Sequence, residues 1–248
     1  MDIHKPKPWH GWRELLKEIG TIVIGVLIAL AGEQAVEAVH RGAEVREARE
    51  ALRGEIAADA AVELRAAAED RCGMLNYDHA IAWAKGGPKP AWTPGLLDAP
   101  PTSVWEAQKG GAVTHMPTKE RLAYAAYYDR VDNQNRGHER QLTVLAEFAS
   151  LLTLDRLSPQ QAERIAALAG IGRLMNATKV ANALELVNIA KTLGVEPATI
   201  PADLRDYVVQ ECKVYGAPAP NFSADQPIPS LAWWAKASTQ GDGEAPHR

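Results

Sequence analysis

Residues 19–32 read IGTIVIGVLIALAG, the one uncharged and strongly apolar run in this 248-residue chain. At about 1.5 Å per residue the run covers roughly 21 Å, which is shorter than a hydrocarbon core of about 30 Å. Extended to residues 15–36 it covers roughly 33 Å, with Lys17, Glu18, Glu33 and Gln34 near its ends. The run therefore predicts a transmembrane helix over residues 15–36, preceded by a short tail over residues 1–14.

Three other interpretations of the run compete with a membrane span. A buried core helix would have to be the most apolar helix of a domain otherwise rich in Ala and Glu. A cleaved signal peptide needs a non-helical exit, whereas helix-favouring sequence continues past Ala29, Ala31 and Gly32. An interfacial amphipathic helix needs a polar face, which the run lacks. We therefore favour an uncleaved span.

The flanking residues predict how the span is anchored and oriented. The rings of Trp9 and Trp12 suit the headgroup level, and the Lys17 side chain can extend its ammonium to the interface. Cationic residues are slightly more numerous before the span than just after it, which favours a cytoplasmic N-terminus. The counted residues are Lys5, Lys7, Arg13 and Lys17 before the span, and Arg41, Arg46 and Arg49 after it.

Small residues within the span predict a helix–helix contact. Gly25, Ala29 and Gly32 follow each other at steps of four and three, so they share one helix face. Small side chains let a second backbone approach closely within the bilayer. The alternative is that Gly and Ala are simply common in membrane helices. We expect the contact to be with a second copy or with another membrane protein.

The two cysteines bear on the compartment. Cys72 and Cys212 are far apart in the sequence and are compatible with a single disulfide in an oxidising environment. The alternative is two unrelated buried thiols.

The rest of the chain predicts an all-α fold. A proline-free stretch over residues 33–71, rich in Ala, Glu, Arg and Leu, predicts a long helix that continues the transmembrane helix and closes at Gly73. Further helices are expected over residues 75–85, 102–109, 117–154, 158–193 and 201–214, with a solvated or kinked section at 132–141 and a bend at Gly170 and Gly172. Together they predict one extracytoplasmic helical bundle over residues 37–237, including an extended strap over 216–230, and a disordered tail over 238–248.

The anchor carries a resemblance. Residues 17–30, KEIGTIVIGVLIAL, resemble the N-terminal signature of an uncharacterised family of bacterial single-span membrane proteins. A second patch, VWEA at 104–107 followed by GGA at 110–112 and by a Tyr pair at 127–128, is similar more loosely. The chain departs from that pattern after the span, with Glu33 and Gln34 in place of an Asn- and Trp-containing exit. The resemblance implies a membrane location and a helical architecture, and it implies no activity. With the orientation favoured above, we expect a bacterial inner-membrane protein whose bulk is periplasmic.

Motifs for chemistry are absent from the sequence. The seven histidines include no pair at i, i+4, and no Cys-x-x-Cys, phosphate loop or Gly-x-Ser-x-Gly is present. A net charge of −4 without a basic run argues against nucleic acid as a partner. Tyr124, Tyr127 and Tyr128, beside Asp129 and Arg130, either line a polar pocket or, as we favour, belong to the core. We therefore expect no catalytic residue, no metal and no cofactor.

Function is consequently predicted only as a class. We expect a membrane-anchored structural or accessory protein that associates with the bilayer and with another membrane protein or itself. The second interpretation is a ligand-binding or sensory helical domain, and an enzyme of unknown type is the third.

Overall fold

The computed structural model describes residues 11–91 and 100–226, and this part of the chain is all-α, as the sequence predicts. Within these ranges no strand occurs. The elements in chain order are α1 (Trp12–Ala84), α2 (Ser103–Gln108), the 3₁₀ helix η1 (Ala112–His115), α3 (Thr118–Leu152), α4 (Pro159–Thr192) and α5 (Ala202–Val214). Outside the described residues lie Trp9, the end of the predicted bundle over residues 227–237 and the predicted tail over residues 238–248.

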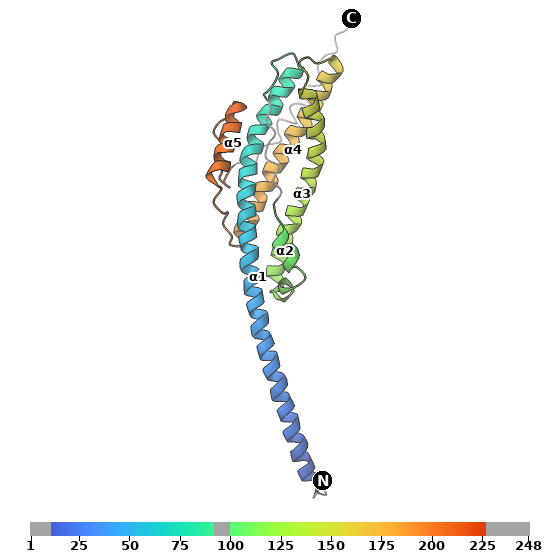
Figure 1. The fold of residues 1–248 in the computed structure, drawn as a ribbon, viewed down its shortest axis with the longest axis vertical. Coiled ribbons are helices and arrows are strands. Elements are labelled where there is room, and N and C mark those ends of the chain that lie inside the picture. The colour runs from blue at the N-terminus through green and yellow to red at the C-terminus, as the bar shows by residue number, and fades with distance from the viewer. Residues whose placement is uncertain (1–10, 92–99, 227–248) are drawn as a thin grey trace, which may run out of the picture.

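Helix α1 dominates the molecule. Its 73 residues form one uninterrupted helix of about 110 Å, which is possible because residues 12–84 contain no proline. The lower half of α1, residues 12–47, extends away from the other helices, and the upper half, residues 48–84, lies among them (Figure 1). The predicted continuation of the apolar run into a long helix is confirmed, but the predicted end at Gly73 is wrong.

Two glycines that we expected to interrupt helices instead allow α1 and α4 to approach each other. A Cβ atom on Gly73 would lie 2.8 Å from Nδ2 of Asn176, and one on Gly172 would collide with the ring of Tyr77. A side chain at either position would therefore push the opposing Asn176 or Tyr77 side chain aside, so both glycines favour the close approach of the two helices. Helix α4 runs without a break through Gly170 and Gly172.

The helix starts follow their sequence signals. Ser158 caps α4 in a capping box, since its hydroxyl accepts from the Gln161 amide at 3.3 Å and the Gln161 side chain accepts from the Ser158 amide at 2.8 Å. Pro117 and Pro201 stand at the N-cap positions of α3 and α5. Helix α3 passes through the polar section at 132–141 without a break, and the short helix η1 was not predicted.

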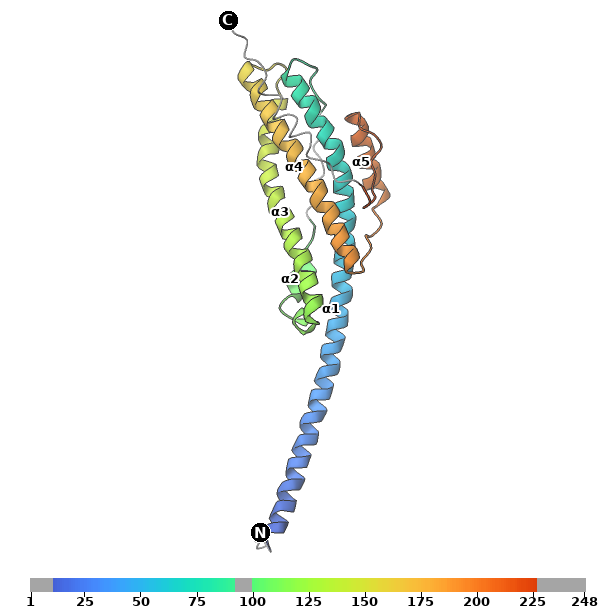
Figure 2. The ribbon, with the colours of Figure 1, turned by 180° about the vertical axis from the view of Figure 1, so that it is seen from behind.

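The helices pack around the upper half of α1. Helices α3 and α4 lie on one side of it and α5 lies on the other, as both views show (Figures 1 and 2). The main core joins α1, α3 and α4 with side chains such as Leu52, Ile56, Val131 and Leu184. A second cluster around Tyr77, Phe148 and Ile165 fills the far end of the bundle, and a third lies between α1 and α5. Each cluster uses α1, so α1 organises the whole bundle.

Candidate functional site

The lower half of α1 exposes an apolar surface. Its aliphatic side chains are unburied, with Ile28 at 68% exposure, and none of the apolar 18-residue window is buried within the structure. Among the described residues this is the one helix long and apolar enough to cross a membrane. Water solvates such a surface poorly, whereas a bilayer core would accommodate it.

The predicted span residues occupy this exposed half. Gly25, Ala29 and Gly32 are exposed along one face, and a Cβ atom on either glycine would meet nothing within 4 Å. Trp12, at 72% exposure, forms the first residue of α1, and the exposed Lys17 accepts a backbone hydrogen bond from the Thr21 hydroxyl at 2.9 Å. The small-residue face is therefore accessible to another helix, but the structure does not bring it against any other part of the described chain.

The upper half of α1 carries a buried acidic face, which the sequence analysis missed. Glu55, Asp59 and Glu63 stand one helical turn apart, and all are buried where α1 faces α3. Glu55 accepts hydrogen bonds from the Tyr128 hydroxyl at 2.7 Å and from the first amides of α2, Val104 at 2.8 Å and Trp105 at 3.2 Å. Glu55 therefore holds α2 and α3 to α1, and it stabilises α2 by capping its N-terminus.

The carboxyls of Glu63 and Asp59 differ in their hydrogen bonds. Glu63 accepts a hydrogen bond from the Gln134 amide of α3 at 2.5 Å. Asp59 is fully buried, with 0% exposure, and neither of its oxygens has a hydrogen bond within the described chain. The Tyr127 hydroxyl, also at 0% exposure, lacks a partner in the same region. Since a buried ionised carboxylate without partners is costly, this geometry favours a protonated Asp59.

Burial shifts the proton affinity of this face. Desolvation, followed by the charges of Glu55 and Glu63, raises the pKa of Asp59 to about 8. Desolvation also raises the pKa of Glu63 to about 7, although the Gln134 hydrogen bond and the Lys179 charge oppose it. The chemistry that the acidic face supports is uptake and release of protons near neutral pH.

Further along α1, the carboxylates have cationic partners. Asp70 forms an ion pair with Lys179 of α4 at 3.0 Å, and Arg65 pairs with Glu69 at 2.8 Å. Burial raises the pKa of Asp70, against the opposing charge of Lys179. Because each of these acids faces a positive charge, this end of the helix differs from the part around Asp59.

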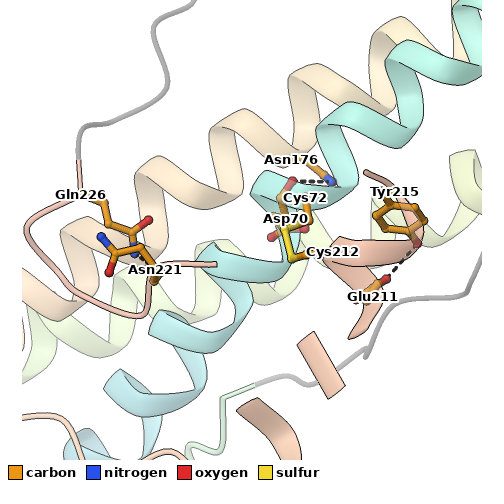
Figure 3. The surroundings of a disulfide bond; sticks show 8 residues. All are labelled: Asp70, Cys72, Asn176, Glu211, Cys212, Tyr215, Asn221 and Gln226. Carbon is orange, nitrogen blue, oxygen red and sulfur yellow. Dashed lines mark hydrogen bonds between the residues drawn. A yellow bond between two sulfur atoms is a disulfide. The ribbon is translucent and has the colours of Figure 1, made fainter. Parts of the chain in front are cut away.

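A disulfide joins α5 to α1. Cys72 and Cys212 are bonded, with their Cα atoms 5.1 Å apart and 140 positions between them in the sequence. In Figure 3 the bond lies between Asp70, whose carbonyl accepts from Asn176 at 3.2 Å, and Tyr215, whose hydroxyl donates to Glu211 at 2.9 Å. The bond fixes a short helix that also packs on α1 through an apolar cluster that includes Ala68, Val208 and Tyr215.

Other candidate groups from the sequence do not form a site. Tyr124, Tyr127 and Tyr128 are buried in the core, while Asp129 is exposed and Arg130 pairs with Glu185 on the bundle surface. The favoured core interpretation of the tyrosines is thus correct. Within residues 11–91 and 100–226, no group of three or more His, Cys, Asp and Glu side chains is arranged to hold a metal ion.

No family model matches this chain, and neither a curated protein nor a solved structure matches it with significance. The resemblance of the anchor to a family of single-span proteins therefore stays a prediction.

Proposed function

We propose that this chain is a single-pass protein of a bacterial inner membrane, with its N-terminus in the cytoplasm and its helical bundle in the periplasm. Its role would be accessory: it acts by associating with another membrane protein or with a second copy. The observation that carries the proposal is the continuity of α1, whose lower half exposes apolar side chains while its upper half forms the bundle core.

The compartment is supported by the disulfide and by the charge bias. A bond between Cys72 and Cys212 persists in oxidising compartments and is rare in the cytosol, which favours a periplasmic bundle. The small excess of cationic residues before the span agrees with a cytoplasmic N-terminus.

Association is supported by the accessible small-residue face. Gly25, Ala29 and Gly32 present no side chain larger than a methyl group, and no described part of the chain covers them. Helices in lipid associate through van der Waals packing, which is strongest where backbones approach closely. A partner helix seated there would be joined to the bundle through one uninterrupted helix.

The test is a double substitution, Gly25→Leu with Ala29→Leu, in the full-length chain. We expect membrane insertion to persist, because hydrophobicity rises, and we expect stoichiometric co-purification of the partner or second copy to be lost. The matched control is Gly20→Leu with Ala31→Leu, which makes the same chemical changes about 140–160° around the helix from the direction midway between Gly25 and Ala29. Equal association in both double variants would contradict the proposal for this face.

Ligand binding is the second candidate function. An open groove of about 490 Å³ lies between the loop after α4 and the segment after α5, lined by residues such as Leu64, Ile200, Arg205 and Phe222. The Arg205 guanidinium lies 5.2 Å from the centre of the Phe222 ring. A small molecule retained by the purified chain, and lost on Arg205→Ala, would favour this function; native mass spectrometry measures it.

A further inference from the structure

The buried acidic face of α1 lies outside the predicted span, among the helices of the bundle. We propose that the contact between α1 and α3 is proton-dependent: the helices pack together while the Asp59 carboxyl carries a proton, and they separate when it loses that proton. This goes beyond the proposed function, and it depends on different residues.

The Asp59 carboxyl is isolated from the hydrogen-bond donors that the structure describes. Its two oxygens are buried without a hydrogen bond within the described chain, and the next acids along its own helix, Glu55 and Glu63, are one turn away on each side. Ionisation would therefore place an unsolvated negative charge beside two other carboxyls. A proton on Asp59 removes that charge.

The elements packed around Asp59 surround its carboxyl with tyrosine hydroxyls, apolar side chains and backbone. The titratable groups of α3 that it influences are the hydroxyls of Tyr127 and Tyr128, and their pKa values rise, mainly through burial. From α4, Val180 and Leu184 add apolar surface to the same core, and the cation Lys179 acts on Glu63 and Asp70. Helix η1 contributes the buried apolar side chain of Val113. Helix α2 contributes the backbone amide of Val104, which donates to Glu55. No basic side chain is among the groups that shift the pKa of Asp59.

The part of α3 that would separate from α1 is its N-terminal part, residues 118–131. The first turns of α3 are joined to α1 by few polar contacts: the paired hydrogen bonds from Arg49 to Glu120 at 2.6 and 2.9 Å, and the bond from Tyr128 to Glu55. Further along α3, the Gln141 amide donates to Asn176 of α4 at 3.1 Å, so α3 has an attachment independent of the acidic face. Separation of residues 118–131 from α1 would break the hydrogen bonds to α1 and expose core side chains such as Tyr128 and Val131, while the Gln141 bond keeps the rest of α3 on α4.

The sign of the pH dependence follows from linkage. Asp59 in the packed state has a pKa of about 8, against 3.8 for the ordinary group, so packing retains a proton that the open state releases. The proton on Asp59 stabilises the packed state in full below about pH 4, and this stabilisation is lost as the pH rises through about 8. Each bound proton changes the opening equilibrium by about tenfold per pH unit.

The experiment is amide hydrogen exchange of the full-length chain in lipid nanodiscs, followed by mass spectrometry over about pH 6 to about pH 8. Once separated from α1, the short helical segment at residues 118–131 loses the packing that stabilises it, so its amides exchange. After correction for intrinsic exchange, we expect the opening constant of peptides within this segment to rise at least about tenfold per pH unit. The Asp59→Asn variant should lose the factor of about ten per pH unit that Asp59 contributes, and only the pH dependence due to Glu63 should remain. Glu50→Gln, which changes an exposed carboxyl on the same helix, should keep the wild-type slope. Equal slopes in the wild type and Asp59→Asn would overturn the proposal.

A second measurement does not depend on the folding of any variant. In the wild-type chain labelled with ¹³C at aspartate carboxyls, the signal assigned to Asp59 should titrate near pH 8, and the signal of Asp70, whose pKa burial also raises, is assigned separately. If the Asp59 signal titrates within the ordinary range of about 2 to 5, Asp59 is ionised in the packed bundle and the proposal fails.

Discussion

The two halves of α1 place their side chains in opposite environments. In the lower half, aliphatic residues such as Ile24 and Leu27 are exposed, whereas in the upper half Asp59 and Glu63 are enclosed. Both arrangements are costly in plain water, the first through exposed apolar area and the second through desolvated carboxyls. One unbroken helix therefore suits two environments: its lower half has a surface that suits lipid, and its upper half has a core face that suits protonated carboxyls.

The largest expected effect comes from removing the disulfide, which would detach α5 from the upper half. In Cys72→Ala with Cys212→Ala, we expect the free energy of unfolding to fall by about 2–5 kcal/mol, because the bond closes a long loop. Chemical denaturation of the detergent-solubilised chain measures it. A reductant should lower the stability of the wild type by a similar amount and leave the double variant unchanged. Two titratable thiols in the unreduced, denatured wild type would contradict the bond.

A charge in the lower half should have the next largest effect. Leu27→Arg places a cation near the centre of the predicted span, at a cost of about 3 kcal/mol for insertion. We expect the fraction of the chain that resists alkaline extraction from membranes to fall. Val39→Arg, at a position 70% exposed and beyond residues 15–36, is the control and should extract like the wild type. Full retention of Leu27→Arg would mean that this half does not span the bilayer.

The smallest effect compares one conservative change in both halves. Ile56→Val removes a methylene group from a fully buried side chain and should lower the free energy of unfolding by about 1 kcal/mol. Ile24→Val makes the same change at an exposed position and should alter unfolding by less than about 0.5 kcal/mol. Denaturation midpoints in one detergent give both values. Equal losses would indicate that Ile24 packs against part of the bundle.

Helix starts and the class of the fold could be predicted because their causes are local. Ser158 with Gln161, and the prolines at 117 and 201, carry their own signals within one turn. Gly73 and Gly172 were misinterpreted because their role depends on the opposing helix, which a single segment does not contain. The polar section of α3 was expected to be solvated or kinked: it is not kinked, and most of its described residues are exposed, whereas Gln134 and Gln141 bond to buried groups of α1 and α4.

The acidic face was missed for a related reason. Glu55, Asp59 and Glu63 visibly share a helix face in the sequence, but acids at that spacing normally lie on a solvated surface. Their burial depends on Tyr127 and Tyr128, which lie more than sixty positions later in the chain. A signal was present in the repeat of acids within an Ala-rich helix together with a tyrosine pair that needs hydrogen-bond acceptors.

The uninterrupted α1 also has a consequence for biosynthesis. Its upper half is synthesised long before its partners, since the bond between Asp70 and Asn176 joins residues 106 positions apart and the disulfide joins residues 140 apart. Contacts this distant in sequence form late, after the intervening chain has been made. A chain that terminates before α4 would therefore retain the apolar end of α1 and lack the helix that covers its core face. Premature termination of synthesis would therefore yield a fragment in which both halves of α1 are uncovered.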